Sequence, residues 1–188
     1  MDPHDMGRPD PALLGLHTGY VSNIDDPEKA GRVRVVIPGL IDEPGSAWAH
    51  PLGTGGGGAK DRGDATIPAV GSEVGIWFKQ GDPDHPYYIT GAWGRDEMPE
   101  PARSAGAEVS KIRVIETEGF RIVLDSRPSS RSLLLEDKAS GDKVELDGVT
   151  RAINIKSTTK LTIEATGIVE IKGATVLING VPAGSGQL

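Results

Sequence analysis

The C-terminal part of the chain repeats itself with a period of eight residues. Residues 153–184 read INIKSTTK, LTIEATGI, VEIKGATV and LINGVPAG, with an aliphatic residue first in each unit and isoleucine third in all but the last. A short, fixed internal period is typical of solenoids, in which each repeat forms one structural unit. The aliphatic side chains at the first and third positions are Ile153, Ile155, Leu161, Ile163, Val169, Ile171 and Leu177.

This octad block predicts strands with one apolar face, because alternate side chains of a strand point the same way. Fully burying one such aliphatic side chain is worth roughly 1.5–3 kcal/mol, so leaving the stripe in water forfeits on the order of 10 kcal/mol. We therefore predict that three copies wrap around a common axis as an intertwined β-prism, with these aliphatic side chains as the core of a homotrimer. The alternative is one long hairpin sheet packed on the barrel, although the block lacks the dipeptides that hairpin turns prefer.

The first half of the sequence predicts a small closed barrel. Five segments have the composition of short strands bounded by turn residues: GYVSNI, GRVRVVIP, SAWAHPL, EVGIWFKQ and YYITGAWG. In the second of them Val33, Val35 and Ile37 alternate with polar residues, which indicates one buried face. Short strands without a helical period are typical of an all-β barrel.

Changes in composition divide the chain into segments. We expect an N-terminal arm (1–17), a barrel (18–95), a linker rich in proline and small residues (96–110), neck strands (111–152) and the octad block (153–188). The neck segment contains KIRVIETEGFRIVLD and SLLLEDKASGDKVELD, which we interpret as hairpin-type strands joined by turns.

Composition excludes several classes of function. The chain contains no cysteine, which rules out disulfides and thiolate metal sites. The net charge is −7, with the acidic excess in residues 1–101, which argues against nucleic-acid backbones as partners. No apolar run reaches the roughly twenty residues of a membrane span. The first residues lack the pattern of a signal peptide, so we expect synthesis in the cytoplasm.

Two short motifs have the outline of ligand sites. GTGGGG (53–58) fits the dinucleotide fingerprint, but neither a helical period nor a phosphate-loop lysine follows it, so we predict a loop. GDPDHP brings Asp82, Asp84 and His85 together, yet its glycine and prolines favour a turn and too few ligands are present for a metal. We predict no catalytic, cofactor or metal site, and therefore no enzyme.

The order of motifs in residues 19–94, together with the octad block, resembles a known family. It is similar to baseplate assembly protein V, the central spike of contractile phage tails. It is also similar to the valine-glycine-repeat spike of type VI secretion and to the spikes of extracellular contractile injection systems. The residues that carry the resemblance include Gly31, Arg32, Val33, Trp48, Pro68, Gly71, Glu73, Gly81, Asp82, Pro83, Pro86 and Gly91.

The resemblance implies an OB-fold barrel followed by a triple-stranded β-helix, in a trimeric needle that pierces the target cell envelope. It implies hub and tube proteins of the baseplate as partners, a separate tip protein at the C-terminal end, transient contact with the target membrane, and a place in a virion tail or injection particle. Arg32, Arg34 and the arm are candidates for hub contacts. A second hypothesis remains, a trimeric OB-fold module that binds carbohydrate or single-stranded nucleic acid through aromatic side chains.

Overall fold

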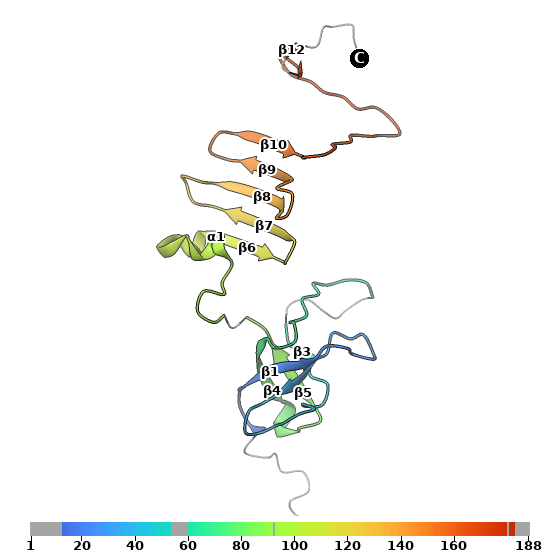
Figure 1. Ribbon diagram of the computed structural model, residues 1–188, viewed down its shortest axis with the longest axis vertical. Coiled ribbons are helices and arrows are strands. Elements are labelled where there is room, and N and C mark those ends of the chain that lie inside the picture. The colour runs from blue at the N-terminus through green and yellow to red at the C-terminus, as the bar shows by residue number, and fades with distance from the viewer. Residues whose placement is uncertain (1–12, 54–59, 92, 180, 183–188) are drawn as a thin grey trace, which may run out of the picture. The chain divides into compact units, whose positions relative to one another are not determined.

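The computed structural model describes residues 13–53, 60–91, 93–179 and 181–182. The chain divides into two compact units, Met1–Arg95 and Asp96–Leu188. Both units consist mainly of β-strands (Figure 1), so the expectation of a mostly β protein is confirmed. Most of the expected arm, the GTGGGG motif after its first glycine and the last residues of the octad block lie outside the described residues.

The first unit is a curled five-stranded sheet in the order β2-β1-β4-β5-β3. Its strands are β1 (His17–Asn23), β2 (Arg34–Val36), β3 (His50–Pro51), β4 (Glu73–Phe78) and β5 (Pro86–Ile89), and η2 (Lys79–Gly81) follows β4. The pairs are antiparallel except for β3 with β5. Val33 and Ala49, which precede the two edge strands, exchange hydrogen bonds of 3.1 and 2.8 Å. This bridge joins the edges of the sheet as a barrel requires.

Alternating side chains fill the interior of this unit. Val33, Val35 and Ile37 are 0%, 0% and 4% exposed, which confirms the buried face expected from their alternation. On β4 the same period buries Val74, Ile76 and Phe78. The remaining members of the core are Leu13, Val21, Ala49 and Tyr88.

The second unit is an antiparallel meander, with the strand order β10-β9-β8-β7-β6. It begins with α1 (Glu100–Arg103) and η3 (Gly106–Lys111), which lie within the segment expected to be a linker. The strands are β6 (Ile112–Glu116), β7 (Phe120–Asp125), β8 (Ser132–Asp137), β9 (Lys143–Asp147) and β10 (Ala152–Lys156). Successive strands are neighbours throughout (Figure 1), so every connection is a short turn.

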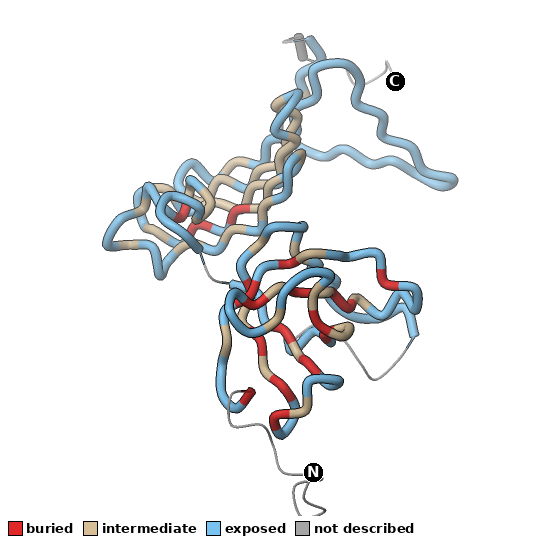
Figure 2. The backbone as a smooth tube through the Cα atoms, turned by 60° about the horizontal axis from the view of Figure 1, so that its bottom comes forward, coloured by how far each residue is buried: buried red, intermediate tan, exposed pale blue. Residues whose placement is uncertain are grey.

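The octad block does not form one continuous strand within a single chain. Its first residues belong to β10, which pairs with β9. Residues 157–175 are all exposed and form no strand, and only the short hairpin of β11 (Leu177–Ile178) and β12 (Val181–Pro182) follows (Figure 2). The alternative of one long hairpin sheet is therefore not what the described residues form.

Candidate functional site

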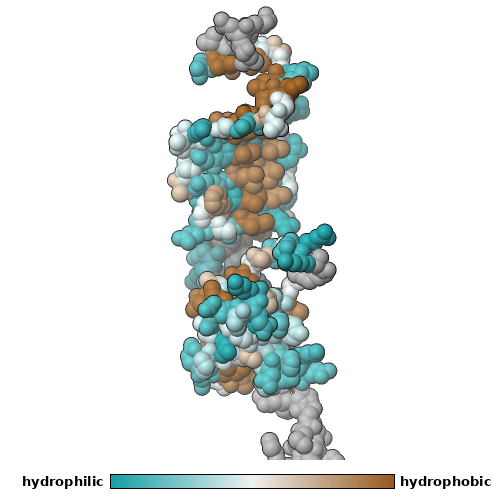
Figure 3. Space-filling view, turned by 90° about the vertical axis from the view of Figure 1, so that its right-hand side faces the viewer, coloured by the Kyte–Doolittle hydropathy of each residue, from teal (hydrophilic) through white to brown (hydrophobic). Residues whose placement is uncertain are grey.

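The main candidate site is an apolar face of the β6–β10 sheet. In an antiparallel sheet, directly paired residues lie on the same face. One row of pairs runs through Leu124, Leu133, Leu146 and Ile153. The next row runs through Ile115, Ile122, Leu135, Val144 and Ile155. Together these two rows form what we call the aliphatic face, visible as the brown band over this sheet in Figure 3.

The aliphatic face is open to solvent in a single chain. Ile122, Leu133 and Val144 are partly exposed, and exposure of the other side chains of the face runs from 41% at Leu124 to 72% at Ile153. Soluble monomers rarely leave a contiguous apolar patch of this kind uncovered, and such patches mark interaction surfaces. The face ends on β10, so it leads directly into the rest of the octad block.

The opposite face of the same sheet carries ion pairs beside the apolar residues Val114, Val123 and Leu134. Arg121 on β7 and Glu136 on β8 form an ion pair of 2.8 Å, and Lys143 and Glu145 on β9 form another of 2.9 Å. These side chains are only partly exposed, and Glu145 also accepts a hydrogen bond from Asn154 at 3.4 Å. The polar groups of this face therefore have partners within the chain, whereas the aliphatic face has none among the described residues.

Aspartates at the ends of successive strands hold the turns of the meander. Asp125, Asp137 and Asp147 each accept a hydrogen bond of 2.8 Å from the backbone N–H two residues later. Asx turns of this kind fix the direction in which the chain reverses. The ion pair with Arg127, the largest cause, lowers the pKa of Asp125 to about 2. Turn geometry and strand register are linked, so these aspartates help to set which side chains share a face.

Asp142 anchors the point at which the octad block leaves the sheet. Its carboxylate accepts hydrogen bonds from the Thr158 N–H at 2.7 Å and from the Ser157 hydroxyl at 3.4 Å. The Thr158 N–H, the largest cause, lowers the pKa of Asp142. Ser157 Oγ also accepts a hydrogen bond from the Lys160 N–H at 3.3 Å, which closes a turn directly after β10.

The aliphatic residues expected to form a trimer core are all exposed in one chain. Beyond β10, exposure is 56% for Leu161, 65% for Ile163 and 50% for Val169. Ile171 and Leu177 are exposed by 64% and 59%. The sequence pattern therefore identified side chains without cover in a single copy, but it missed the neighbouring rows of the neck strands. The alternation within RIVLD, SLLLED and KVELD carried that signal.

The first unit contains a buried ion pair between Asp26 and Arg32. The carboxylate of Asp26 lies 2.6 Å from the Arg32 guanidinium, and both side chains are at most 10% exposed. Asp26 also accepts hydrogen bonds from the N–H groups of Glu28, Ala30 and Arg32. The Arg32 contact, the largest cause, lowers the pKa of Asp26 far below its usual range.

The expected family-motif residues of the first unit lie near this ion pair, in turns, or at buried and strand positions. Two guanidinium groups lie near the Trp48 ring, with Arg34 Cζ 5.0 Å and Arg32 Cζ 5.8 Å from the ring centre. Val33 and Pro86 are buried, Pro68 is partly buried, and Glu73 begins β4. The turn glycines of the motif, all with positive φ, are Gly31, Gly71, Gly81 and Gly91.

The GDPDHP segment forms the expected turn. Asp82 accepts a hydrogen bond from the Asp84 N–H at 3.0 Å, and His85 Nδ1 lies 2.8 Å from its carboxylate. The Asp84 N–H, the largest cause, lowers the pKa of Asp82. Pro83 completes this turn. No group of three or more potential metal ligands occurs among the described residues, and none of the described helices is long and apolar enough to cross a membrane.

These features define a mostly β protein with a small barrel unit and a meander unit. The comparison with protein families then assigns residues 17–93 to the type VI secretion system/phage-baseplate injector OB domain. This part of the chain is therefore an injector OB domain, and the resemblance to the baseplate spike family is confirmed over it. The assignment supports a structural role in a baseplate or related injector. A search among curated proteins found no match.

Proposed function

We propose that the chain is the homotrimeric central spike of a contractile injection machine, a phage tail or a related particle. Its role is mechanical and non-enzymatic: the barrel attaches to hub and tube proteins, and the octad block forms a needle that pierces the target envelope. The single observation that carries the proposal is the aliphatic face of β6–β10, which continues into the uncovered aliphatic positions of the octad block.

The energetic argument for self-association is direct. At roughly 1.5–3 kcal/mol for each fully buried aliphatic side chain, the octad positions alone supply on the order of 10 kcal/mol per chain. Neighbouring copies offer a cover that matches in length and period, because each carries the same repeat. Residues 157–175 lack strand partners in one chain, and pairing between copies satisfies their backbone groups.

Three copies suit the geometry better than two. A pair of facing strands encloses little interior, whereas three sheets arranged around an axis turn every aliphatic face inward. The small fifth position of the repeat, Ser157, Ala165 and Gly173, then eases the corners of a triple-stranded β-helix. The outer surface is polar, since Glu170 and Lys172 pair at 2.9 Å while both remain mostly exposed.

A rod of this kind transmits force, because opening one strand requires breaking hydrogen bonds to both neighbours. The proposal includes transient contact with the target membrane, a separate tip protein at the C-terminal end and no bound cofactor. It divides the chain into the arm, barrel, linker, neck and needle at the boundaries expected from the sequence. The motif residues of the barrel serve its fold and its attachment to the hub.

Sedimentation velocity of the full chain at micromolar concentration tests this proposal. We expect a species of about three times the 19.7 kDa mass of one chain. Ile163→Asp should yield monomers, because it places three carboxylates at the axis. Thr162→Asp is the matched control, since the neighbouring side chain points outward and the trimer should persist. A wild-type monomer, or equal behaviour of both variants, contradicts the trimer.

The same two variants test the role in a particle. When each replaces the wild-type chain in the producing cell, Ile163→Asp should abolish assembled, injection-competent particles, whereas Thr162→Asp should retain them. Particle counts by electron microscopy and a killing or infection assay give the readout. Normal particles with Ile163→Asp contradict a spike role.

A further inference from the structure

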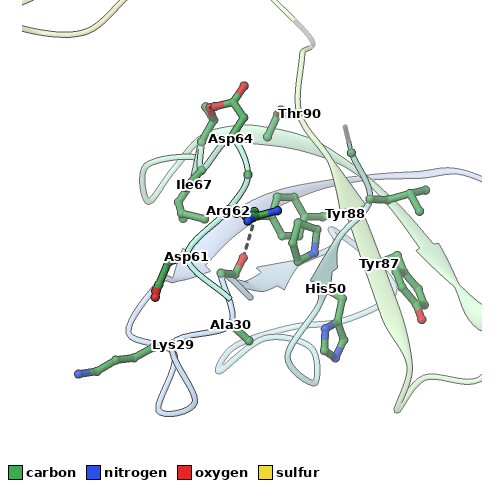
Figure 4. A pocket seen from close by; sticks show the side chains of 17 residues that line it. Lys29, Ala30, His50, Asp61, Arg62, Asp64, Ile67, Tyr87, Tyr88 and Thr90 are labelled. Atoms are coloured by element: carbon green, nitrogen blue, oxygen red, sulfur yellow. Dashed lines mark hydrogen bonds between the residues drawn. The ribbon is translucent and has the colours of Figure 1, made fainter. Parts of the chain in front are cut away.

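A cavity of about 1080 Å³ opens on the first unit, beside β3 and β5. Its walls come from β3, β5, the Lys29–Gly31 turn and the segment from Asp61 to Ile67 (Figure 4). Gly31 is the one motif residue among the described residues that line this cavity, and the proposed needle does not use it. Cavities that hold small ligands usually measure roughly 300–1,000 Å³, so this one has room for an extended ligand.

One wall of the cavity is aromatic and rests on rigid strands. Tyr87 on β5 pairs in register with His50 on β3, and their ring centres are 5.9 Å apart with a tilt of 40°. On the other edge of β5, Tyr87 pairs with Trp77 of β4. The three side chains therefore lie in one row across the sheet. Tyr87 is half-buried and His50 is exposed, so both rings are accessible.

Tyr88 also lines the cavity and is fixed in place. Its ring is 2% exposed, and its hydroxyl donates a hydrogen bond of 2.8 Å to the Gly31 carbonyl. Burial raises the pKa of this hydroxyl, so it stays protonated as a donor. Gly31 in turn allows Ile67 to approach closely, since a Cβ there would lie 3.1 Å from Ile67 Cδ1. The aromatic wall and the opposite wall are thereby held together by direct contacts.

The opposite wall is polar and balanced in charge. Figure 4 shows Asp61 and Lys29 on the side away from His50 and Tyr87, with Arg62 beside Tyr88. Asp64 adds a second carboxylate, and the formal charges of the two acids and two bases cancel. Thr66 and Thr90 add hydroxyl groups. This wall offers donors and acceptors in several directions without the positive excess that phosphate backbones need.

We infer that this cavity binds a neutral oligosaccharide. The rings of Tyr87 and His50 provide flat surfaces for the apolar faces of sugar rings, and the polar wall provides partners for hydroxyl groups. Barrels of the OB type bind oligosaccharides as well as oligonucleotides on their strand faces and adjoining loops. The balanced charge of the cavity and the acidic excess of residues 1–101 favour the sugar over the nucleic acid.

Titration of the full chain with cellotetraose and with chitotetraose, followed by calorimetry and by amide NMR shifts, tests the inference. We expect saturable binding of at least one probe, with shifts confined to residues that line the cavity. Tyr87→Ala and Arg62→Ala should each weaken binding about tenfold. Arg62 is exposed in a loop, so its variant should keep the fold. Tyr20→Ala is the matched control, because Tyr20 is 43% exposed on the same unit but lies outside the cavity.

Three results would overturn the inference. The first is no binding of either sugar at millimolar concentration. The second is binding that Tyr87→Ala and Arg62→Ala leave unchanged, or shifts that lie elsewhere on the chain. The third is tighter, salt-sensitive binding of an oligo-thymidylate probe, which assigns the cavity to single-stranded nucleic acid. None of these results bears on the trimer, which depends on the second unit.

Discussion

Ile153 on β10 lies directly opposite Leu146 on β9 in the antiparallel register, and in one chain these side chains are 72% and 44% exposed. This pair joins the first octad to the aliphatic rows of the neck strands. The apolar surface therefore begins at β6 and not at the first repeat. The proposed trimer core is correspondingly longer than the octad positions alone.

Ile153→Ala should destabilise the trimer by about 2–5 kcal/mol per chain, the range for removing a buried isoleucine side chain. Urea unfolding at two protein concentrations, followed by circular dichroism, measures the change. Asn154→Ala is the control, because the neighbouring side chain lies on the opposite face of the sheet. Equal effects of both variants would argue against burial of Ile153 between copies.

Asp26→Asn should lower the melting temperature of the barrel, because it removes the charge that pairs with the buried Arg32 guanidinium. Glu28→Gln is the control: Glu28 also lies near Arg32, at 3.2 Å, but its side chain is 71% exposed and should matter little. Tryptophan fluorescence reports on this unit, since all three Trp residues lie within it.

The effect of Asp26→Asn should depend on pH. The folded state holds the pKa of Asp26 far below its usual value, so the carboxylate stabilises the fold fully above the unfolded pKa of about 3.9. That contribution decreases as the pH falls further. The difference in melting temperature between wild type and variant should therefore be largest near neutral pH and shrink at about pH 3. A difference in melting temperature that stays constant with pH would contradict stabilisation by the charged Asp26 carboxylate.

Asp125→Asn should remove part of the acid sensitivity of the second unit. Its pKa is about 2 when folded, against about 3.9 when unfolded, so its stabilisation is lost as the pH falls from about 4 to about 2. Methyl NMR signals of the β6–β10 aliphatic residues report unfolding across this window. Glu118→Gln, at an exposed turn position, is the control and should leave the acid transition unchanged.

Gly31→Ala should destabilise the barrel more than Gly71→Ala. Both glycines have φ in the left-handed region, +74° and +88°, which costs an alanine about 1–2 kcal/mol. A Cβ on Gly31 also meets Ile67 Cδ1 at 3.1 Å, whereas a Cβ on Gly71 meets nothing within 4 Å. Thermal unfolding of the two variants separates the backbone effect from the contact with Ile67. An equal decrease in melting temperature for both variants would exclude a role for Ile67.

Local patterns in the sequence were enough for much of the barrel. The alternation of Val33, Val35 and Ile37 predicted a buried face, and all three side chains are buried. Arg32, which precedes this alternating stretch, is also buried, with only 9% exposed. Arg32 is buried together with Asp26, its ion-pair partner, and no pattern in the sequence predicted that these two residues pair. A contact between side chains six residues apart has no periodic signal.

For the neck strands, the sequence alone could not predict which side chains share a face. Their sequences predicted hairpins, but which side chains share a face depends on register, and register depends on turn geometry. The Asx turns at Asp125, Asp137 and Asp147 fix the reversals, and the paired strands then bring Leu124, Leu133 and Leu146 into one row. The cavity of the first unit is likewise assembled from segments far apart in the chain.

The sequence by itself determined the strand periods, the octad repeat and the family of the barrel, because each is a local or ordered pattern of residue types. Only the tertiary structure decided that Asp26 and Arg32 are buried together, that His50 and Tyr87 form one wall, and that the aliphatic face runs from β6 to β10. Those relationships arise when pairing brings distant residues side by side, and no spacing along the chain encodes which residues will meet.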